Sequence, residues 1–218
     1  GVEASILSFT DSKIIVPLLS AKDHKKIGED ETGLNTGGMG VISPNPFVTD
    51  EIFEKFKLDV MEPTLKGMQA EGMDFAGVIF FGLMITKKGV YLLEYNMRMG
   101  DPETQAVLPL LENDLLELIE KTFDKKLSEV KVNWKPLHSC CVVAAAGGYP
   151  ESYKKGDEIT GVLNFNETAD NKVFICGAKV EDGKLLTNGG RVLNAVALGN
   201  TLEEAQKKAY KLLNSINF

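Results

Sequence analysis

The residues best suited to chemistry lie in the segment YLLEYNMRMGDPETQ, at positions 91–105. Side chains alternate between the two faces of a β-strand. If this segment is a strand, one face carries Leu92, Glu94, Asn96 and Arg98, and the other carries Leu93, Tyr95 and Met97. A carboxylate beside an amide oxygen gives the hard ligands that Mg²⁺ prefers, and an arginine can bind phosphate oxygens with two hydrogen bonds. The pattern predicts a site for a metal-bound phosphate.

The residues that follow this strand indicate the start of a helix. Asp101 is a residue type that caps helices, and Pro102 is favoured at the first helical position. We expect a helix N-terminus there, with free backbone amides and a positive dipole end close to the metal. The pattern alone leaves a second interpretation open, namely an edge strand with one wet face and a helix that Asp101 merely caps.

A glycine-rich segment, ETGLNTGGMG at 31–40, is the second candidate for binding. It is not a Walker loop because no GK[ST] follows, and it is not a dinucleotide fingerprint because it does not open a helix after a strand. Gly37, Gly38 and Gly40 permit positive φ and close backbone approach, so successive amides can form an anion-binding nest. A plain turn is the alternative.

Three motifs together resemble one known family. The pattern ExNxRxGDPETQ, preceded by FAGVIFFGLMI at 75–85, resembles the ATP-grasp ligases and, more narrowly, the phosphoribosylamine–glycine ligase family. The segment AKDHKKIGEDETGLNTGGMGVISP at 21–44 is similar to the same family. AAAGGYPESYKKGDEITG together with GGRVLNAVALG resembles its C-terminal domain.

This resemblance implies an α+β fold in two domains. The first, residues 1–132, would be an ATP-grasp domain that lacks its N-terminal portion and has an antiparallel sheet with helices. The second, residues 133–218, would be the family's small, mostly antiparallel β domain with a terminal helix. A composition shift at VNWKPLHS, residues 132–139, marks the expected boundary.

The resemblance also implies roles for individual residues. Glu94 and Asn96 would bind Mg²⁺ or Mn²⁺, and Arg98 would stabilise charge during phosphoryl transfer from ATP, the co-substrate. Nucleotide contacts are implied for Glu3 and Met84. Contacts with the other substrates are implied for Asn35, Thr36, Gly37, Gly38, Asp101, Pro102, Glu103 and Thr104. Gly82 departs from the wider superfamily, which commonly has an acidic metal ligand there.

The implied reaction is the ATP-dependent ligation of glycine to 5-phosphoribosylamine through glycyl phosphate, a step of purine biosynthesis that yields glycinamide ribonucleotide, ADP and phosphate. We expect the chain to need the missing N-terminal part of the same protein, and to be inactive alone. Two alternatives stay open: another ATP-grasp carboxylate–amine ligase, and a non-catalytic module that binds a nucleotide or a partner. The sequence leaves the oligomeric state open.

The composition of the chain limits the classes of partner that it is expected to bind. With a net charge of -7 and a pI near 5.0, the chain is not expected to bind nucleic acid or an anionic membrane. There is no apolar run of the roughly 20 residues that a membrane span needs, and no signal-like N-terminus. We expect Cys140, Cys141 and Cys176 to be reduced and buried in a cytoplasmic protein. His24 has no second ligand at suitable spacing, so zinc is not expected.

The remaining patterns predict the elements that position these residues. Strands are expected at GVEASILSF and KIIVPLLS, and at 76–85 and 90–97 with the turn KKG between them. A helix should begin at Thr49 and Asp50 and be kinked or interrupted at Pro63, and another should begin near Asn113 and Asp114. Short strands are expected at CCVVAAAGG, KVFICGAKV and RVLNAVALG, before a helix whose capping box is Thr201 and Glu204.

Overall fold

The chain begins with a long antiparallel hairpin, as its two apolar runs predict. In the computed structural model, which describes residues 1–162 and 168–218, strand β1 is Val2–Thr10 and β2 is Ile15–Asp23. Asp11 closes the turn, because its Oδ1 accepts hydrogen bonds from the backbone N–H groups of Lys13 and Ile14, both at 3.0 Å. The described residues divide into two units. Unit 1 comprises 1–22 and 43–135, and unit 2 comprises 23–42 and 136–218.

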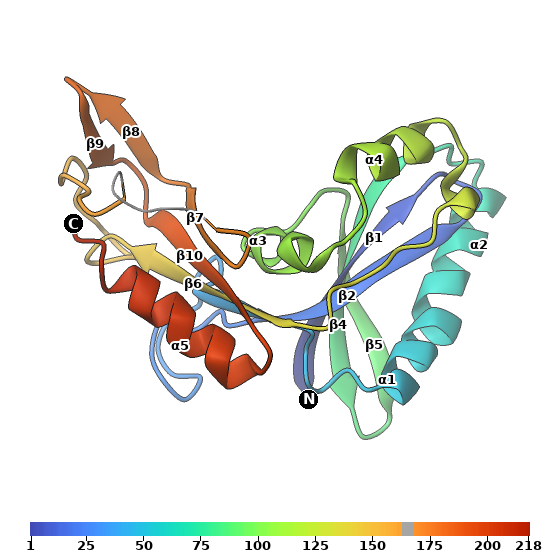
Figure 1. Cartoon of the computed structure of the whole chain (residues 1–218). Coiled ribbons are helices and arrows are strands. Elements are labelled where there is room, and N and C mark those ends of the chain that lie inside the picture. Colours follow the sequence, from blue (N-terminus) through green and yellow to red (C-terminus); the bar gives the residue numbers. More distant parts are fainter. Residues whose placement is uncertain (163–167) are drawn as a thin grey trace. The chain divides into compact units, whose positions relative to one another are not determined.

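The sheet of unit 1 has the strand order β5-β4-β1-β2, with antiparallel neighbours (Figure 1). Strand β4 is Gly77–Thr86 and β5 is Gly89–Asn96, joined by the predicted tight turn. Along β1, Ser5 pairs with Gly82 of β4, and Gly82 pairs with Glu94 of β5. This register places the three side-chain positions in one row on one face of the sheet.

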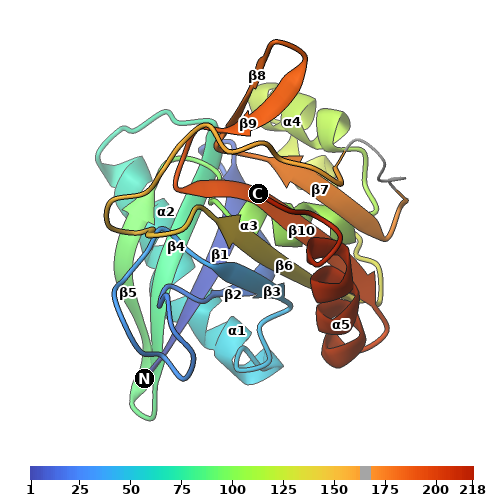
Figure 2. The ribbon, with the colours of Figure 1, turned by 90° about the vertical axis from the view of Figure 1, so that its left-hand side faces the viewer.

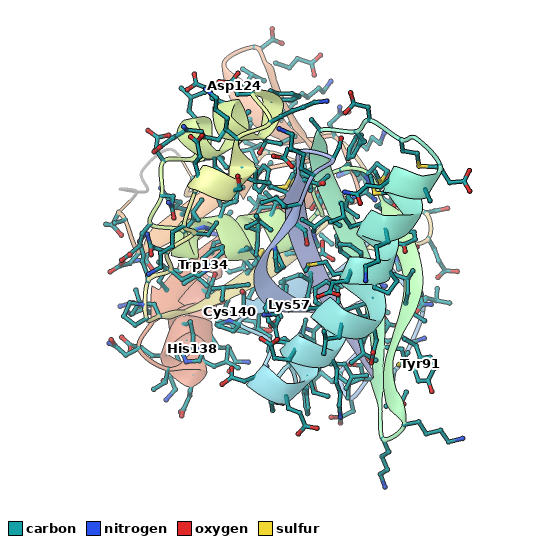
Figure 3. All side chains as sticks on the ribbon, turned by 90° about the vertical axis from the view of Figure 1, so that its right-hand side faces the viewer. Lys57, Tyr91, Asp124, Trp134, His138 and Cys140 are labelled. Atoms are coloured by element: carbon teal, nitrogen blue, oxygen red, sulfur yellow. The ribbon has the colours of Figure 1, made fainter. Side chains whose placement is uncertain are left out.

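Helices α1 (Asp50–Phe56) and α2 (Glu62–Ala70) cover the other face of this sheet (Figure 3). Thr49 caps α1 as predicted, because its side-chain oxygen accepts from the Ile52 N–H at 3.3 Å. A π-helical turn, η1 (Lys57–Met61), joins the two helices, and Pro63 lies in the first turn of α2. The backbone stays helical from residue 50 to residue 70, so Pro63 does not interrupt it; the irregularity is the π-helical turn that precedes the proline.

The core of unit 1 lies between these helices and the sheet. Phe56 of α1 and Phe81 of β4 are fully buried and meet edge to face, with ring centroids 5.2 Å apart. Ile79, Leu83 and Val60 pack around them. Because Phe81 occupies this face, its neighbour Gly82 belongs to the opposite face, where the polar row of Ser5 and Glu94 lies.

The remaining elements of unit 1 follow β5. They are α3 (Glu103–Val107), the 3₁₀ turn η2 (Leu108–Leu110), α4 (Leu115–Phe123) and η3 (Leu127–Glu129). Asp114 caps α4 as predicted, accepting from the Leu116 N–H at 2.8 Å. The leucines of α4 are only partly buried, since Leu118 is enclosed whereas Leu116 is 62% exposed.

Unit 2 is an antiparallel β unit closed by a helix, as predicted (Figure 2). Its strands are ordered β3-β6-β10-β7, with β3 at Gly40–Ser43, β6 at His138–Ala145, β7 at Asn171–Ile175 and β10 at Arg191–Gly199. A separate hairpin pairs β8 (Ala178–Glu181) with β9 (Lys184–Thr187). Helix α5 (Leu202–Leu213) packs on β6 and β10, where Ala205 and Ala209 contact Cys140 and Ala197.

Three sequence predictions for unit 2 need correction. The segment KVFICGAKV forms two strands, because the chain leaves the sheet at Gly177 before β8 begins. Cys176 is exposed, whereas Cys140 and Cys141 are buried as predicted. Thr201 does cap α5, but the Glu204 carboxylate accepts from the N–H of Asn200 and not from that of Thr201.

Candidate active site

Glu94 and Asn96 lie on the same face of β5, as the alternation predicts. In the cross-strand register, Gly82 pairs with Glu94 and Phe80 pairs with Asn96. Neither side chain makes a hydrogen bond or an ion pair with any residue in 1–162 or 168–218. A carboxylate and an amide oxygen are therefore held on a paired strand with their lone pairs available to a cation.

A β-bulge in β5 corrects one part of the predicted alternation. The register shifts between Gly82 and Leu83, because Leu83 pairs with Leu92 and leaves Leu93 as the extra residue. Leu92 consequently packs with the apolar core beneath the helices and does not share a face with Glu94. The prediction for Leu92 was wrong because a pattern of period two cannot register one inserted residue.

Gly82 leaves the space that the Glu94 side chain occupies. A Cβ atom built on Gly82 would lie 2.9 Å from Cγ of Glu94, closer than such atoms pack. A carboxylate side chain at position 82 would thus compete with Glu94 for the same volume. This explains in physical terms how the departure from the wider superfamily fits the local packing.

The row beside Glu94 holds the two residues expected to contact nucleotide. Glu3 of β1 pairs with Met84 of β4, two residues along from the row of Ser5, Gly82 and Glu94. All of these positions share one face because each lies an even number of residues from its neighbour along the strand. The structure therefore brings Glu3, Met84, Glu94 and Asn96 onto one face of unit 1.

Arg98 lies beyond the end of β5, which stops at Asn96. Its side chain is exposed, and Nη1 donates a hydrogen bond to the carbonyl of Met99 at 2.9 Å. This bond orients the guanidinium group while its remaining N–H donors stay available to an anion. Arg98 follows the metal-ligand pair along the chain without being part of its strand ladder.

The helix after this strand begins later than predicted. Helix α3 starts at Glu103, with Pro102 as the residue before it and no side-chain cap. Asp101 is therefore not the N-cap, and its Oδ1 accepts from Nε2 of Gln105 at 3.2 Å. Thr104 Oγ1 donates to the carbonyl of Gly100 at 2.6 Å, which fastens the first turn to the preceding loop.

Glu103 is a buried carboxylate. It is 5% exposed, and its Oε1 accepts from Ser5 Oγ at 3.2 Å. Because Ser5 belongs to the row of Gly82 and Glu94, this bond fixes α3 over the face that carries the metal-ligand candidates. Sequence reasoning missed Ser5, since a serine within an apolar strand carries no signal for a contact 98 residues away.

The glycine-rich loop belongs to unit 2, and its backbone is closely hydrogen-bonded. Gly37 N–H donates to Tyr149 Oη at 3.0 Å, and Gly38 N–H donates to Thr36 Oγ1 at 3.0 Å. His24, predicted to be structural, lies with Nδ1 3.3 Å from the Gly40 carbonyl. The anion-nest interpretation therefore needs correction, because the amides of Gly37 and Gly38 already have acceptors within the chain.

Tyr149 and Arg191 contact this loop, and the sequence did not predict either contact. Arg191 Nη1 donates to the carbonyl of Gly37 at 2.7 Å. Both residues flank glycines, and a Cβ atom on Gly190 would collide with the Tyr149 ring. The pair of glycines before Arg191 was the available signal, since glycines allow a side chain and a backbone to approach closely. Asn35, in contrast, presents an exposed amide side chain.

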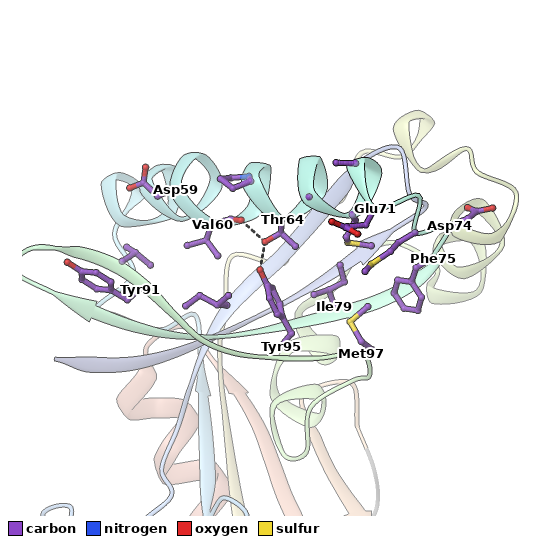
Figure 4. A pocket seen from close by; sticks show the side chains of 17 residues that line it. Asp59, Val60, Thr64, Glu71, Asp74, Phe75, Ile79, Tyr91, Tyr95 and Met97 are labelled. Carbon is purple, nitrogen blue, oxygen red and sulfur yellow. Dashed lines mark hydrogen bonds between the residues drawn. The ribbon is translucent and has the colours of Figure 1, made fainter.

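An apolar hollow of about 930 Å³ lies on the opposite face of β5, beneath α2 (Figure 4). Val60, Ile79 and Met97 contribute to its wall. Its polar centre is the pair formed by Tyr95 Oη and Thr64 Oγ1, 2.7 Å apart, and Thr64 Oγ1 also lies 2.7 Å from the Val60 carbonyl. These hydroxyls satisfy one another, and Glu94 and Asn96 are not among the lining residues.

Within residues 1–162 and 168–218, no group of three or more His, Cys, Asp or Glu side chains could hold a metal ion by itself. A cation held by Glu94 and Asn96 would need additional ligands, such as phosphate oxygens and water, and Mg²⁺ commonly keeps several waters. The residues present therefore fit a metal ion that arrives with a nucleotide. In the same described part, no helix is long and apolar enough to cross a membrane.

Comparisons with known proteins identify relatives across nearly the whole chain. Residues 1–104 match the family model of the phosphoribosylglycinamide synthetase ATP-grasp (A) domain, and residues 139–218 match that of the C domain. Phosphoribosylamine–glycine ligases from Fusobacterium nucleatum and Clostridium acetobutylicum are 57% and 56% identical, and each match covers 100% of this chain. The chain spans about half the length of these curated relatives, 51% in both cases.

Solved structures agree with these matches. The crystal structure of phosphoribosylamine–glycine ligase from Thermotoga maritima is 34% identical, with a TM-score of 0.85, over 100% of this chain and 53% of that one. An L-amino acid ligase from Bacillus licheniformis, at 14% identity and a TM-score of 0.64, covers 100% of this chain and 51% of that one. At that identity, the second match indicates a shared fold alone.

Proposed function

The chain belongs to the phosphoribosylglycinamide synthetase family, and we propose that the protein of which it forms about half ligates glycine to 5-phosphoribosylamine at the expense of ATP. The products would be glycinamide ribonucleotide, ADP and phosphate, so the reaction would serve purine biosynthesis. The observation that carries this proposal is the pair of Glu94 and Asn96, whose side chains have no partner among the described residues and share a face with Glu3 and Met84.

The proposal assigns the nucleotide to this face of unit 1. The Glu94 carboxylate and the Asn96 amide oxygen would hold Mg²⁺ or Mn²⁺ together with phosphate oxygens. The apolar Met84 side chain would pack against the adenine ring, and the neighbouring Glu3 would accept hydrogen bonds from ribose hydroxyls. When bound, the cation would neutralise negative charge on the terminal phosphates.

The reaction would proceed in two balanced steps. A carboxylate oxygen of glycine attacks the γ-phosphorus, and the bond from this phosphorus to the bridging β-phosphate oxygen breaks. ADP is the leaving group, and the other product is glycyl phosphate. The amine nitrogen of phosphoribosylamine then attacks the acyl carbon, phosphate leaves with the bonding electron pair, and the nitrogen loses a proton. Arg98, oriented by the Met99 carbonyl, would donate hydrogen bonds to the transferring phosphoryl oxygens.

The two other substrates are assigned to the remaining candidates. In unit 1 these are Asp101, Pro102, Glu103 and Thr104. Glu103 would act by holding the segment in place, because it is buried against Ser5. In unit 2 they are Asn35, Thr36, Gly37 and Gly38, of which Asn35 presents an exposed amide group. The backbone groups of Gly37 and Gly38 would act by setting the shape of the loop.

The test is a measurement of ADP release by the complete protein with ATP, glycine and phosphoribosylamine. We expect turnover that depends on all three substrates and on a divalent cation. The 218-residue chain alone should be inactive, because the relatives are about twice as long. A panel of other amino acids and amines is the control for specificity, and faster turnover with a different pair would replace this proposal by another carboxylate–amine ligation.

A further inference from the structure

We propose that Arg191 and Tyr149 are positioning residues that clamp the backbone of Gly37 by binding its carbonyl and its N–H. The glycine-rich loop is thereby preformed for one of the two non-nucleotide substrates. This inference rests on the proposed function. The carbonyl of Gly37 accepts from Arg191 Nη1 at 2.7 Å, while its N–H donates to Tyr149 Oη at 3.0 Å. One residue of the loop is thus held on both sides by residues 112 and 154 positions later in the chain.

The residues that flank Gly37 and Gly38 are held independently of this clamp. Thr36 N–H donates to the Lys25 carbonyl at 2.8 Å, and Met39 N–H donates to the His24 carbonyl at 2.8 Å. Thr36 Oγ1 also donates to the Lys25 carbonyl at 2.8 Å. The residues on either side are therefore fixed by local bonds, and what the clamp adds is the conformation of the bulge at Gly37 and Gly38 between them.

The clamp is built on a rigid corner of unit 2. Arg191 is the first residue of β10 and pairs with Ala145 of β6. The carbonyl of Gly190 accepts from the Ala146 N–H at 2.8 Å, and Gly190 leaves room for the Tyr149 ring, which also packs against Tyr153 with centroids 6.1 Å apart. The strand ladder therefore fixes the backbone position of Arg191, and ring packing orients Tyr149, independently of the loop.

The backbone groups of Gly37 do not need these bonds in order to be hydrogen-bonded. Gly37 is exposed, so water could satisfy its N–H and carbonyl groups in the absence of Tyr149 and Arg191. The hydrogen bonds from Arg191 and Tyr149 consequently fix the conformation of Gly37 and are not needed to compensate for its burial. Fixing a loop in its binding conformation before the ligand arrives lowers the entropy lost on binding, which appears in substrate affinity.

The experiment compares three variants of the complete protein with a matched control. Arg191→Met removes the guanidinium donors and keeps an unbranched apolar stem, Arg191→Lys retains one charged group, and Tyr149→Phe removes only the hydroxyl. The control is Lys179→Met, which removes a cation of unit 2 from its pair with Glu181, where the distance is 2.7 Å. Steady-state constants for ATP, glycine and phosphoribosylamine are measured together with hydrogen exchange of residues 35–38.

We expect Arg191→Met to raise KM for glycine or phosphoribosylamine about 10-fold, with kcat and the KM for ATP changed by less than about threefold. Arg191→Lys should restore part of the affinity, Tyr149→Phe should show a smaller rise, and Lys179→Met should match the wild type. Exchange at Gly37 should become faster in Tyr149→Phe. The hydrogen-exchange result stands even if Arg191→Met fails to fold.

Unchanged exchange and unchanged KM values in both Arg191→Met and Tyr149→Phe would overturn the clamp. An equal loss toward all three substrates with a lowered thermal midpoint would also overturn it, because that pattern marks a purely structural role. If the wild-type complete protein does not join glycine to phosphoribosylamine, the proposed function fails. The hydrogen-exchange comparison would still decide whether Tyr149 and Arg191 hold the loop.

Discussion

The polar face of β5 in unit 1 and the glycine-rich loop of unit 2 are both rich in groups that could bind ligands, yet they use them differently. Glu94 and Asn96 keep their oxygens without partners among the described residues. In the loop, the N–H groups of Gly37 and Gly38 and the carbonyl of Gly37 are already bonded within the chain. Under the proposed function, the first groups would bind a ligand directly, whereas the second would shape the surface around one.

The two regions also differ in what holds them rigid. Glu94 and Asn96 belong to a strand paired along its length with β4, so the backbone ladder fixes their positions and the side chains need no further support. Gly37 and Gly38 lie between the backbone-bonded residues Thr36 and Met39, outside any ladder, and two side chains from distant parts of the sequence bond to Gly37. A site on a strand can therefore leave its polar side chains open, whereas a site on a loop uses part of its polar groups for its own shape.

The largest effect should follow from Glu94→Ala. We expect at least about a 100-fold loss of kcat/KM for ATP in the complete protein, because a metal ligand is removed. Unfolding free energy should change by less than about 0.5 kcal/mol, since the side chain is exposed and has no partner in the described chain. Steady-state kinetics and a denaturant titration measure the two quantities. A large loss of stability together with activity would make Glu94 a structural residue.

Gly82→Ala should act on the same site indirectly. The new Cβ would lie 2.9 Å from Cγ of Glu94 and would displace that side chain, so divalent-metal affinity should fall about 10-fold. Gly67→Ala is the matched control, because nothing lies within 4 Å of its Cβ position in the interior of α2. That substitution should stabilise the protein by about 0.5 to 1 kcal/mol without changing metal affinity. Equal metal affinities in both variants would contradict the proposed packing.

Within the loop, Gly38→Ala and Gly37→Ala should differ. Gly38 is buried with φ of +111°, a conformation that other residues adopt with strain, so alanine should cost about 1 to 3 kcal/mol. A Cβ on Gly37 would meet the guanidinium of Arg191 at 3.1 to 3.2 Å, and this flexible group can move away. The cost there should stay below about 1 kcal/mol. Denaturant titrations of both variants test this order of stability losses, and a reversed order would show that Gly37 and Gly38 are not held as described.

The last prediction concerns the thiols of unit 2 and does not involve catalysis. Burial raises the pKa of the Cys140 thiol to about 11, so its thiolate fraction at pH 8 is very small. Cys176 is exposed. Mass-spectrometric mapping after brief alkylation should find Cys176 modified at least about 100-fold faster than Cys140. Comparable rates would indicate that β6 opens readily and that the support of the loop is not rigid.

Local patterns predicted those parts of the fold that local physics decides. The hairpin of β4 and β5 and the caps at Thr49 and Asp114 each depend on residues close in sequence. The start of α3 was mistaken by one residue, because Asp101 followed by Pro102 has the composition of a helix start while the carboxylate bonds to Gln105 instead. The bulge at Leu93 was missed because one unpaired residue changes the register without altering the composition.

The candidate site was predictable only where it lies on one strand. Glu94 and Asn96 follow from alternation, and their shared face is confirmed by the register with Gly82 and Phe80. The contact of Ser5 with Glu103 and the bonds of Gly37 to Tyr149 and Arg191 join residues that are far apart in the chain. No local pattern encodes such contacts, because they depend on how whole strands and loops pack.

The central claim is that Glu94 and Asn96 bind the metal of a nucleotide complex, and Mn²⁺ binding measured by electron paramagnetic resonance tests it most directly. The complete protein would be titrated in the presence of a non-hydrolysable ATP analogue. We expect Glu94→Gln and Asn96→Ala each to weaken Mn²⁺ binding at least about 10-fold. Asp59→Asn, which changes a carboxylate beside the apolar hollow on the opposite face, should leave it unchanged. Wild-type Mn²⁺ affinity in both Glu94→Gln and Asn96→Ala would contradict the account.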